Sequence, residues 1–179
     1  MKLNKIWIII LFCAVLSSAC QKENESNTIS IAEHLETNGV TDYQETDSGL
    51  IYVIGEQGEG APLADGDSVR VHFDGLYTNN NLFSSSYGGL PLTFQLGNNL
   101  MLEGFEEGIK LLNVGGYARL YIPNHLAYGK NGGSNGFGAD EDVIFDVEVL
   151  NPLLSIDEYL LINEIIKMEK CGTNTKRTF

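Results

Sequence analysis

The sequence has little cysteine, proline, tryptophan or positive charge, and these shortages limit how the chain can be stabilised. Cysteine occurs three times in 179 residues, and Cys13 and Cys20 both lie in an N-terminal segment with the features of an export signal. Removal of a signal ending before Cys20, and modification of Cys20 itself, would leave only Cys171. The mature chain could then form neither an intrachain disulfide nor a metal site built from cysteine. We therefore expect a hydrophobic core to hold the fold.

Positive charge is scarce, because 11 Lys and Arg residues face 24 Asp and Glu residues, for a net charge of −13. Phosphate groups would be repelled by such a chain, so the composition argues against nucleic acid as a partner. It also argues against adhesion to an anionic lipid surface. A solubilising acidic surface is the simpler interpretation, and recognition of a basic partner is the alternative.

The most apolar stretch, residues 7–16, is too short to span a bilayer as a helix. It follows the positive residues Lys2 and Lys5 and precedes Ser17, Ser18, Ala19 and Cys20, the order found in a signal peptide. Small residues directly before a cysteine resemble the lipobox of bacterial lipoproteins. The resemblance predicts a signal peptide over residues 1–19 and a lipid on Cys20, which would anchor an exported protein to the cell envelope, on its periplasmic face or at the cell surface. An ordinary signal peptide with an incidental cysteine is the alternative.

The remaining chain divides into a tether, one domain and a C-terminal segment. Residues 20–48 predict a polar tether with a short helix at 30–38, where Ser30 and Glu33 form a capping box. Residues 49–151 predict one domain with strands at 50–54, 68–77, 92–96, 117–122 and 143–150 and a helix at 104–112. That pattern favours an α+β fold in which a five-stranded antiparallel sheet packs on one central helix. Residues 152–179 predict a further amphipathic helix and a tail.

An apolar site is predicted where residues 96–108 join a strand to the central helix. Met101, Leu102 and Phe105 lie at this junction, and Phe73, Phe145 and Tyr128 are expected to converge on it. Aliphatic and aromatic walls with few polar groups suit an apolar ligand. No activated nucleophile and no metal-ligand cluster accompanies them, so we expect neither cofactor nor metal.

Three glutamates open the predicted central helix, at positions 103, 106 and 107. Negative side chains are favourable near a helix N-terminus. The pattern therefore predicts that Glu103, Glu106 and Glu107 form an acidic rim or a solvated helix start. The three histidines lie on different predicted elements, and His72 alternates away from the core face of its strand. A structural or solvent role is favoured for them over metal binding.

Residues 49–150 resemble the FKBP-type peptidyl-prolyl isomerases. The matching motifs occur in the family's order: GDSVRVHFDG (66–75), LFSSS (82–86), PLTFQLG (91–97), GFEEGI (104–109), VGG (114–116), IP (122–123), LAYG (126–129) and VIFDVEVL (143–150). One such motif would be weak, whereas this many in sequence are specific. The resemblance implies a half-open antiparallel sheet wrapped around one helix.

The resemblance also implies a set of pocket residues. The residues expected to act on the bound proline are Phe73, Leu102, Phe105, Tyr128 and Phe145. Those expected to line the substrate site are Phe83, Ser84, Leu92, Met101 and Phe137. Ser84 stands where the family has an aspartate and Phe73 where it has a tyrosine, so two polar groups are missing from the pocket edge and a reduced activity is expected.

The function implied is peptidyl-prolyl cis-trans isomerisation of exported proteins, with proline-containing polypeptides as partners. The alternative is a non-catalytic module on the same fold that binds peptides as a chaperone. The C-terminal helix is a candidate dimerisation element, so a homodimer is a further hypothesis.

Overall fold

The computed structural model describes residues 28–133 and 138–151. Its elements in chain order are α2 (Ile31–Thr37), β1 (Gln44–Glu45), β2 (Ile51–Glu56), β3 (Ser68–Tyr77), β4 (Leu82–Ser85), β5 (Leu92–Gln95), α3 (Glu103–Lys110), β6 (Tyr117–Ile122), the short 3-10 turns η2 (Asn124–Leu126) and η3 (Gly129–Asn131), and β7 (Val143–Val149). The amphipathic helix expected within residues 152–179 lies outside the described residues.

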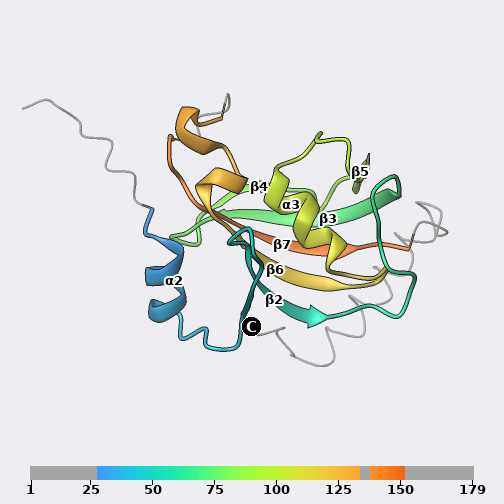
Figure 1. The fold of residues 1–179 in the computed structure, drawn as a ribbon, viewed down its shortest axis with the longest axis horizontal. Coiled ribbons are helices and arrows are strands. Elements are labelled where there is room, and N and C mark those ends of the chain that lie inside the picture. Colours follow the sequence, from blue (N-terminus) through green and yellow to red (C-terminus); the bar gives the residue numbers. More distant parts are fainter. Residues whose placement is uncertain (1–27, 134–137, 152–179) are drawn as a thin grey trace, which may run out of the picture.

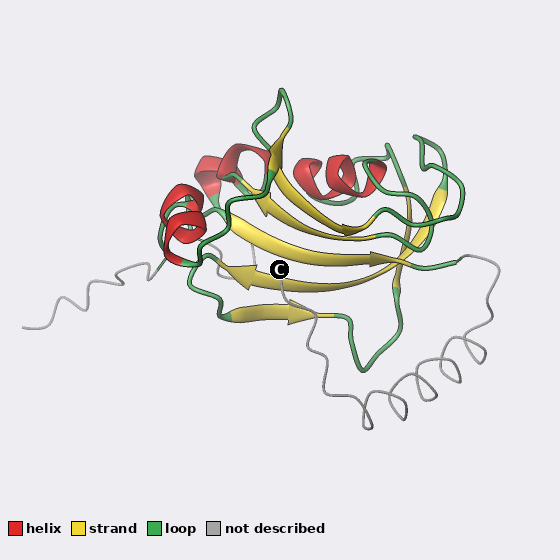
Figure 2. Ribbon diagram, turned by 90° about the horizontal axis from the view of Figure 1, so that it is seen from below, coloured by secondary structure: helices red, strands yellow, loops and turns green. Residues whose placement is uncertain are grey.

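The strands form one antiparallel sheet in the order β1-β2-β6-β7-β3-β4 (Figures 1 and 2). Strand β5 also pairs with β3, along the part of β3 that does not pair with β4. The long central pair β3 and β7 aligns Val71 with Val149 and Tyr77 with Val143. All five expected strands are present, which confirms the α+β antiparallel prediction. The structure adds two short edge strands that the sequence did not predict: β1, within the expected polar tether, and β4.

Helix α3 packs on one face of the sheet, where it closes the main core (Figure 1). Phe105, Ile109 and the following Leu112 point from it into the buried cluster formed by the inward-facing residues of the strands. The helix can approach β6 closely because Gly108 has no side chain: a Cβ there would collide with Leu120. The sheet and α3 thus form the two layers of the domain.

Helix α2 covers part of the opposite face of the sheet. Ile31 and Leu35 pack there against Tyr121 and Ile144 in a second, smaller core. His34 is also buried, and its Nδ1 lies 2.6 Å from the carbonyl oxygen of Thr78. The sequence expectation of a structural role for this histidine agrees with that contact.

His72 lies on the same outer face, as the strand alternation predicted, but solvent does not reach it. The side chain is 2% exposed because the ring of Tyr87 stacks over it at a centroid distance of 4.8 Å. Its Nδ1 lies 2.9 Å from Ser86 Oγ, and Tyr87 donates a hydrogen bond to Glu148 at 3.1 Å. Of the two roles that the sequence left open for His72, structural or solvent, the burial supports the structural one.

Within the described ranges, no helix has both the length and the apolar character needed to cross a bilayer.

Candidate functional site

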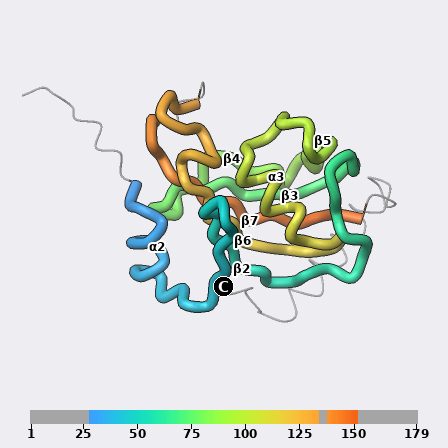
Figure 3. Tube along the Cα trace, in the orientation of Figure 1, coloured from blue at the N-terminus to red at the C-terminus, as the bar shows by residue number. Residues whose placement is uncertain are grey.

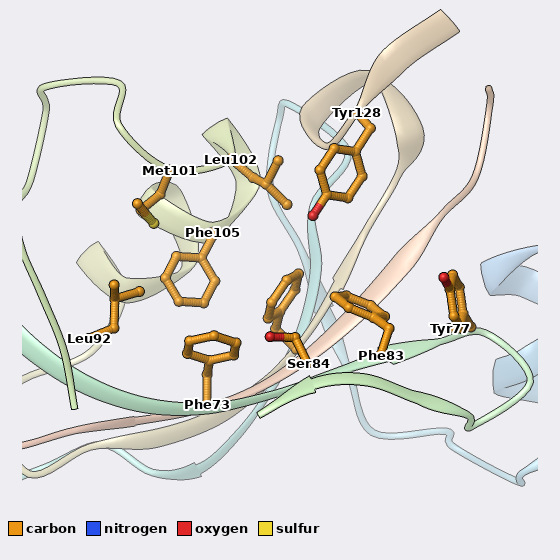
Figure 4. A pocket seen from close by; sticks show the side chains of 10 residues that line it. Phe73, Tyr77, Phe83, Ser84, Leu92, Met101, Leu102, Phe105 and Tyr128 are labelled. Carbon is orange, nitrogen blue, oxygen red and sulfur yellow. The ribbon is translucent and has the colours of Figure 1, made fainter. Parts of the chain in front are cut away.

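The described part of the chain contains a pocket of about 320 Å³ between α3 and the sheet. Figure 4 shows that side chains enter it from several elements: from α3 and the loop before it, from strands β3, β4, β5 and β7, and from the segment after β6. The lining residues are Phe73, Tyr77, Phe83, Ser84, Leu92, Met101, Leu102, Phe105, Tyr128 and Phe145. None of these side chains carries a charge at neutral pH. The site is therefore suited to an apolar ligand.

Aromatic rings in edge-to-face or tilted contact form the floor and walls of the pocket. Phe145 lies at the centre of this cluster, with ring centroids 5.1 Å from Phe105, 5.6 Å from Phe83 and 5.8 Å from Phe73. Phe73 also meets Phe105 edge to face at 5.9 Å. Such pairs are favourable beyond the area that they bury. The mutual contacts fix the orientation of each ring, so the cavity is preformed.

Gly75 makes this arrangement possible. It lies two residues after Phe73 on the same face of β3, and a Cβ there would come within 2.7 Å of the Phe83 ring and 3.0 Å of the Phe145 ring. Real Cβ atoms do not approach other atoms so closely, so a larger residue would displace both rings. The gap left by Gly75 is what allows Phe83 and Phe145 to meet.

The loop before α3 presents Met101 and Leu102, and the carboxylate of Glu106 holds this loop from beneath. It accepts backbone hydrogen bonds from Gly97 at 2.8 Å and from Leu100 and Met101 at 3.1 Å each. Glu106 is only 5% exposed, so the expectation that it is part of a solvated helix start is wrong. The first turn of the helix turns this side chain back under the loop, and three charge-assisted hydrogen bonds compensate for its burial.

Leu102 is the residue that precedes α3, and its carbonyl accepts the N–H groups of Phe105 and Glu106. Among the described residues, no hydrogen-bond acceptor faces the N–H of Leu102. Since the residue lines the pocket, this donor is available to a ligand carbonyl.

Tyr128 lies between η2 and η3 and directs its hydroxyl into the pocket (Figure 4). Two contacts hold the segment that carries it: Nε2 of His125 lies 2.9 Å from the carbonyl of Ser48, and Asn124 donates its N–H to Asp142 at 2.9 Å. Asp142 also accepts the N–H of Ile31, at 3.4 Å, so α2 and these turns lie at the same end of the molecule (Figure 3).

Burial, and secondarily the neighbouring Tyr77, raise the pKa of Tyr128 above its usual value. The phenol therefore stays protonated throughout the neutral range. In this state the hydroxyl can donate a hydrogen bond but cannot act as a base.

The structure brings nine of the ten expected pocket residues around one cavity; Phe137, the tenth, lies outside the described residues. Their individual roles remain predictions. Sequence reasoning missed Tyr77, which lines the pocket beside Phe83 at a ring distance of 5.1 Å. The signal was present, because residues 73, 75 and 77 share one face of a strand.

Known proteins support the same fold. The family model described as FKBP-type peptidyl-prolyl cis-trans isomerase matches residues 60–150. The protein named FkpA of Buchnera aphidicola subsp. Baizongia pistaciae is 38% identical over 111 residues, which are 62% of this chain and 43% of that relative. FkpA of Escherichia coli strain K12 is 38% identical over 105 residues, or 58% of this chain and 38% of the relative. The chain thus spans less than half the length of these relatives.

Solved structures agree. The crystal structure of FkpA from Escherichia coli has a TM-score of 0.61 at 31% identity and covers 84% of this chain and 73% of that one. The crystal structure of AtFKBP13 has a TM-score of 0.58 at 28% identity, with coverage of 62% and 98%. All ten pocket residues lie within residues 60–150, which are just over half of the sequence. The chain belongs to the FKBP-type peptidyl-prolyl cis-trans isomerase family.

Proposed function

We propose that this protein catalyses cis-trans isomerisation of X-Pro peptide bonds in exported polypeptides. The observation that carries the proposal is the preformed, uncharged pocket of about 320 Å³, whose lining matches the set expected for the family at nine positions. Its size and apolar walls suit a proline ring with part of the adjacent chain.

The reaction needs no proton transfer and no covalent intermediate. Rotation about the peptide bond faces a barrier of about 20 kcal/mol, because the planar amide is stabilised by resonance. Twisting the bond removes the resonance and leaves a less polar C–N linkage, which water solvates less well than the planar amide. A dry pocket therefore favours the twisted state over the planar one. Catalysis is then differential binding of the transition state.

Each part of the pocket has a role in this scheme. Phe105 supports the proline ring from below, and Phe73 and Phe145 form the side walls. The N–H of Leu102 binds one substrate carbonyl and the hydroxyl of Tyr128 binds another. Because the pKa of Tyr128 is raised by burial, the hydroxyl keeps its proton at neutral pH and can donate this hydrogen bond.

A protease-free isomerisation assay tests the proposal directly. The purified full-length chain is added in catalytic amounts to a proline-containing peptide whose cis-to-trans relaxation is followed by fluorescence or NMR. We expect a relaxation rate that increases linearly with protein concentration. A rate equal to the spontaneous one at every protein concentration would refute isomerase activity.

A second candidate function is capture of proline-containing segments without useful turnover. Ser84 favours it, because this pocket residue supplies a hydroxyl where the family has a carboxylate. Equilibrium binding of a peptide together with an unchanged isomerisation rate would establish the binding module in place of the enzyme.

We further propose that Cys20 is lipidated after removal of residues 1–19, which would place the domain in the bacterial cell envelope. The support is the order of positive, apolar and small residues before this cysteine. Cys20 lies outside the described residues. Incorporation of a clickable fatty acid by the wild-type chain, and its loss in Cys20→Ser, would support the anchor; equal labelling of both would refute it.

A homodimer formed through residues 152–179 is the remaining proposal on assembly. It rests on the amphipathic pattern of that segment, which the described structure does not cover. Light scattering of the full chain, compared with a chain ending at residue 151, measures it. A monomer mass for the full chain would refute the dimer.

A further inference from the structure

Tyr77 lines the pocket but lies outside the set of residues that the family resemblance implied. It is the last residue of β3. Its ring packs against that of Phe83 at a centroid distance of 5.1 Å, with the two ring planes tilted by 57°. The reaction scheme proposed above gives Tyr77 no role, although its phenol group belongs to the wall of the same cavity.

Tyr77 lies some distance along the pocket from Phe105, on which the proline ring is proposed to rest. Three successive ring contacts lead to it, from Phe105 to Phe145 at 5.1 Å, from Phe145 to Phe83 at 5.6 Å, and from Phe83 to Tyr77 at 5.1 Å. Figure 4 shows Tyr77 beyond Phe83, on the side of Phe105 away from Leu92. An extended peptide advances about 3.3 Å per residue. A substrate residue about two to four positions from the proline can therefore reach Tyr77.

The part of the pocket around Phe83 carries hydroxyl groups. Tyr77 contacts Phe83, Ser84 follows it in β4, and Tyr128 directs its hydroxyl toward this region (Figure 4). The two phenol groups lie near enough to influence each other, because Tyr77 contributes to the raised pKa of Tyr128. A hydroxyl group both donates and accepts hydrogen bonds. This part of the pocket is therefore polar without being charged.

The backbone around Tyr77 is fixed by hydrogen bonds. Its N–H donates to the carbonyl of Asn81 at 2.9 Å, and its own carbonyl accepts the N–H of Asn80 at 2.9 Å. The carbonyl of the next residue, Thr78, lies 2.6 Å from Nδ1 of the buried His34. The strand end is thus held in place before a ligand arrives, which reduces the conformational entropy lost on binding.

We propose that Tyr77 forms a hydrogen-bonding subsite that selects a hydroxyl or amide side chain about two to four residues from the proline of the substrate. The inference rests on the proline site of the proposed function, because the distance is counted from a proline on Phe105. It names the substrate class: prolines that have Ser, Thr, Asn or Gln nearby in the chain.

The chemistry of the pocket favours these side chains over three others. A carboxylate is disfavoured by the net charge of −13. A cationic side chain would lose hydration in a pocket whose lining residues include no acidic group. An apolar side chain would displace water from the phenol without replacing its hydrogen bonds. A hydroxyl or amide group, in contrast, can both donate to and accept from the phenol.

The test uses pairs of fluorescent peptides that share one X-Pro core in an alanine background. The members of a pair differ at one position, which carries threonine in one peptide and valine in the other, so that a hydroxyl replaces a methyl group of similar size. Separate pairs place this position two, three or four residues from the proline, on either side. Affinities for the full-length chain are measured by fluorescence anisotropy. One neutral hydrogen bond predicts that, at one of these positions, the threonine peptide binds about twofold to tenfold more tightly.

The decisive variant is Tyr77→Phe, which removes the hydroxyl and keeps the ring that packs on Phe83. We expect it to bind the threonine and valine peptides equally, at the affinity of the wild type for the valine peptide. Tyr52→Phe is the matched control, because that hydroxyl donates to Gln44 and lies outside the pocket lining. We expect this control to keep the full preference for threonine.

The two proposals fail in different ways. Equal affinity within every pair, or a preference that persists in Tyr77→Phe, would overturn the subsite and leave the proline site intact. An equal loss of affinity for both peptides in Tyr77→Phe would also overturn it, because the hydroxyl would then bind the peptide backbone, which every ligand offers. A preference that Tyr77→Phe abolishes, in a protein that leaves the isomerisation rate unchanged, would support the subsite and refute the isomerase activity. Absence of binding for all peptides would overturn both.

Discussion

The carboxylate of Glu106, in the first turn of α3, accepts the backbone N–H of Met101 at 3.1 Å, five residues earlier in the chain. The same carboxylate binds the N–H groups of Leu100 and Gly97. One buried side chain thus fixes the loop that forms one wall of the pocket. The relationship links the stability of the domain to the geometry of its candidate site.

Glu106→Gln should therefore reduce both stability and activity. The amide retains one acceptor but turns its NH₂ group toward backbone donors, so at least one charge-assisted hydrogen bond is lost. We expect about 2 kcal/mol less unfolding free energy and a several-fold lower kcat/KM, measured by urea denaturation and by the isomerisation assay.

Glu107→Gln is the matched control, because the neighbouring carboxylate accepts a hydrogen bond from Ser48 Oγ and none from the loop. Its stability should change by less than about 0.5 kcal/mol, as at most surface positions. Equal effects of the two substitutions would show that the loop does not depend on Glu106.

Tyr128→Phe should lower kcat/KM by about twofold to tenfold, because one neutral hydrogen bond contributes roughly 0.5–1.5 kcal/mol. The raised pKa of Tyr128 means that the hydroxyl remains protonated to a higher pH than in an exposed tyrosine. The ratio of wild-type to variant activity should therefore stay constant between pH 7 and pH 9. Tyr52→Phe is the control, since that hydroxyl donates to Gln44 instead. A ratio that falls as the pH rises through this range would mean that Tyr128 ionises there.

His72 should make the domain sensitive to mild acid. Burial lowers its pKa, which the nearby Glu148 partly offsets. As the pH falls, His72 of the unfolded chain binds a proton near pH 6.5, whereas His72 of the folded protein binds it only at a lower pH. The contribution of this group to stability is therefore complete above pH 6.5 and is lost as the pH falls toward the pKa of the folded state. The slope from this single group is at most about 1.4 kcal/mol per pH unit.

Unfolding free energies of wild type and His72→Gln, measured by urea denaturation between pH 7.5 and pH 5, test this. The variant is expected to be less stable at pH 7.5, where it loses the stack with Tyr87, but to show a shallower decline with acid. Parallel slopes for the two proteins would exclude His72 as the acid-sensitive group.

Gly108→Ala should destabilise the domain although alanine favours helices over glycine by about 0.8–1.0 kcal/mol. The new methyl group would collide with the side chain of Leu120, which is fully buried and cannot move aside. Overpacking of this kind costs about 1–3 kcal/mol. The double variant Gly108→Ala/Leu120→Ala should lose less stability than the two single variants add up to, by more than about 0.5 kcal/mol. If the stability losses of the two single variants add up to that of the double variant, the cost of Gly108→Ala does not come from contact with Leu120.

The helices and strands could be predicted from the sequence because the periodicity of apolar residues is a local property. Alternating apolar residues located all five main strands and the capping pattern located α2, each within a few residues of its observed ends. The strand β1 has only two residues, and the edge strand β4, with the sequence LFSS, lacks the alternation of apolar and polar residues that located β5. Tyr77 was overlooked although the face shared with Phe73 implied its direction.

Two polar residues show the limit of the same reasoning. Glu106 was expected to be solvated, since charged side chains outside the apolar stripe usually are, and for His72 the sequence left a structural and a solvent role open. In the structure, the loop over Glu106 and the ring of Tyr87 over His72 come from other parts of the chain. Burial of this kind depends on which distant segment packs over a residue, and the local sequence pattern does not contain that information.

The order of residues by itself determined which segments become strands and helices, which side chains face the core, and that the candidate site would be aromatic and uncharged. These properties follow from local backbone geometry and from the periodic placement of apolar groups. The tertiary structure decided how the rings of Phe73, Phe83 and Phe94 meet those of Phe145 and Phe105, how close α3 lies to β6, and which carboxylate supports the pocket loop. Those outcomes depend on the packing of segments distant in the chain, where a difference of an ångström decides whether two groups touch or collide.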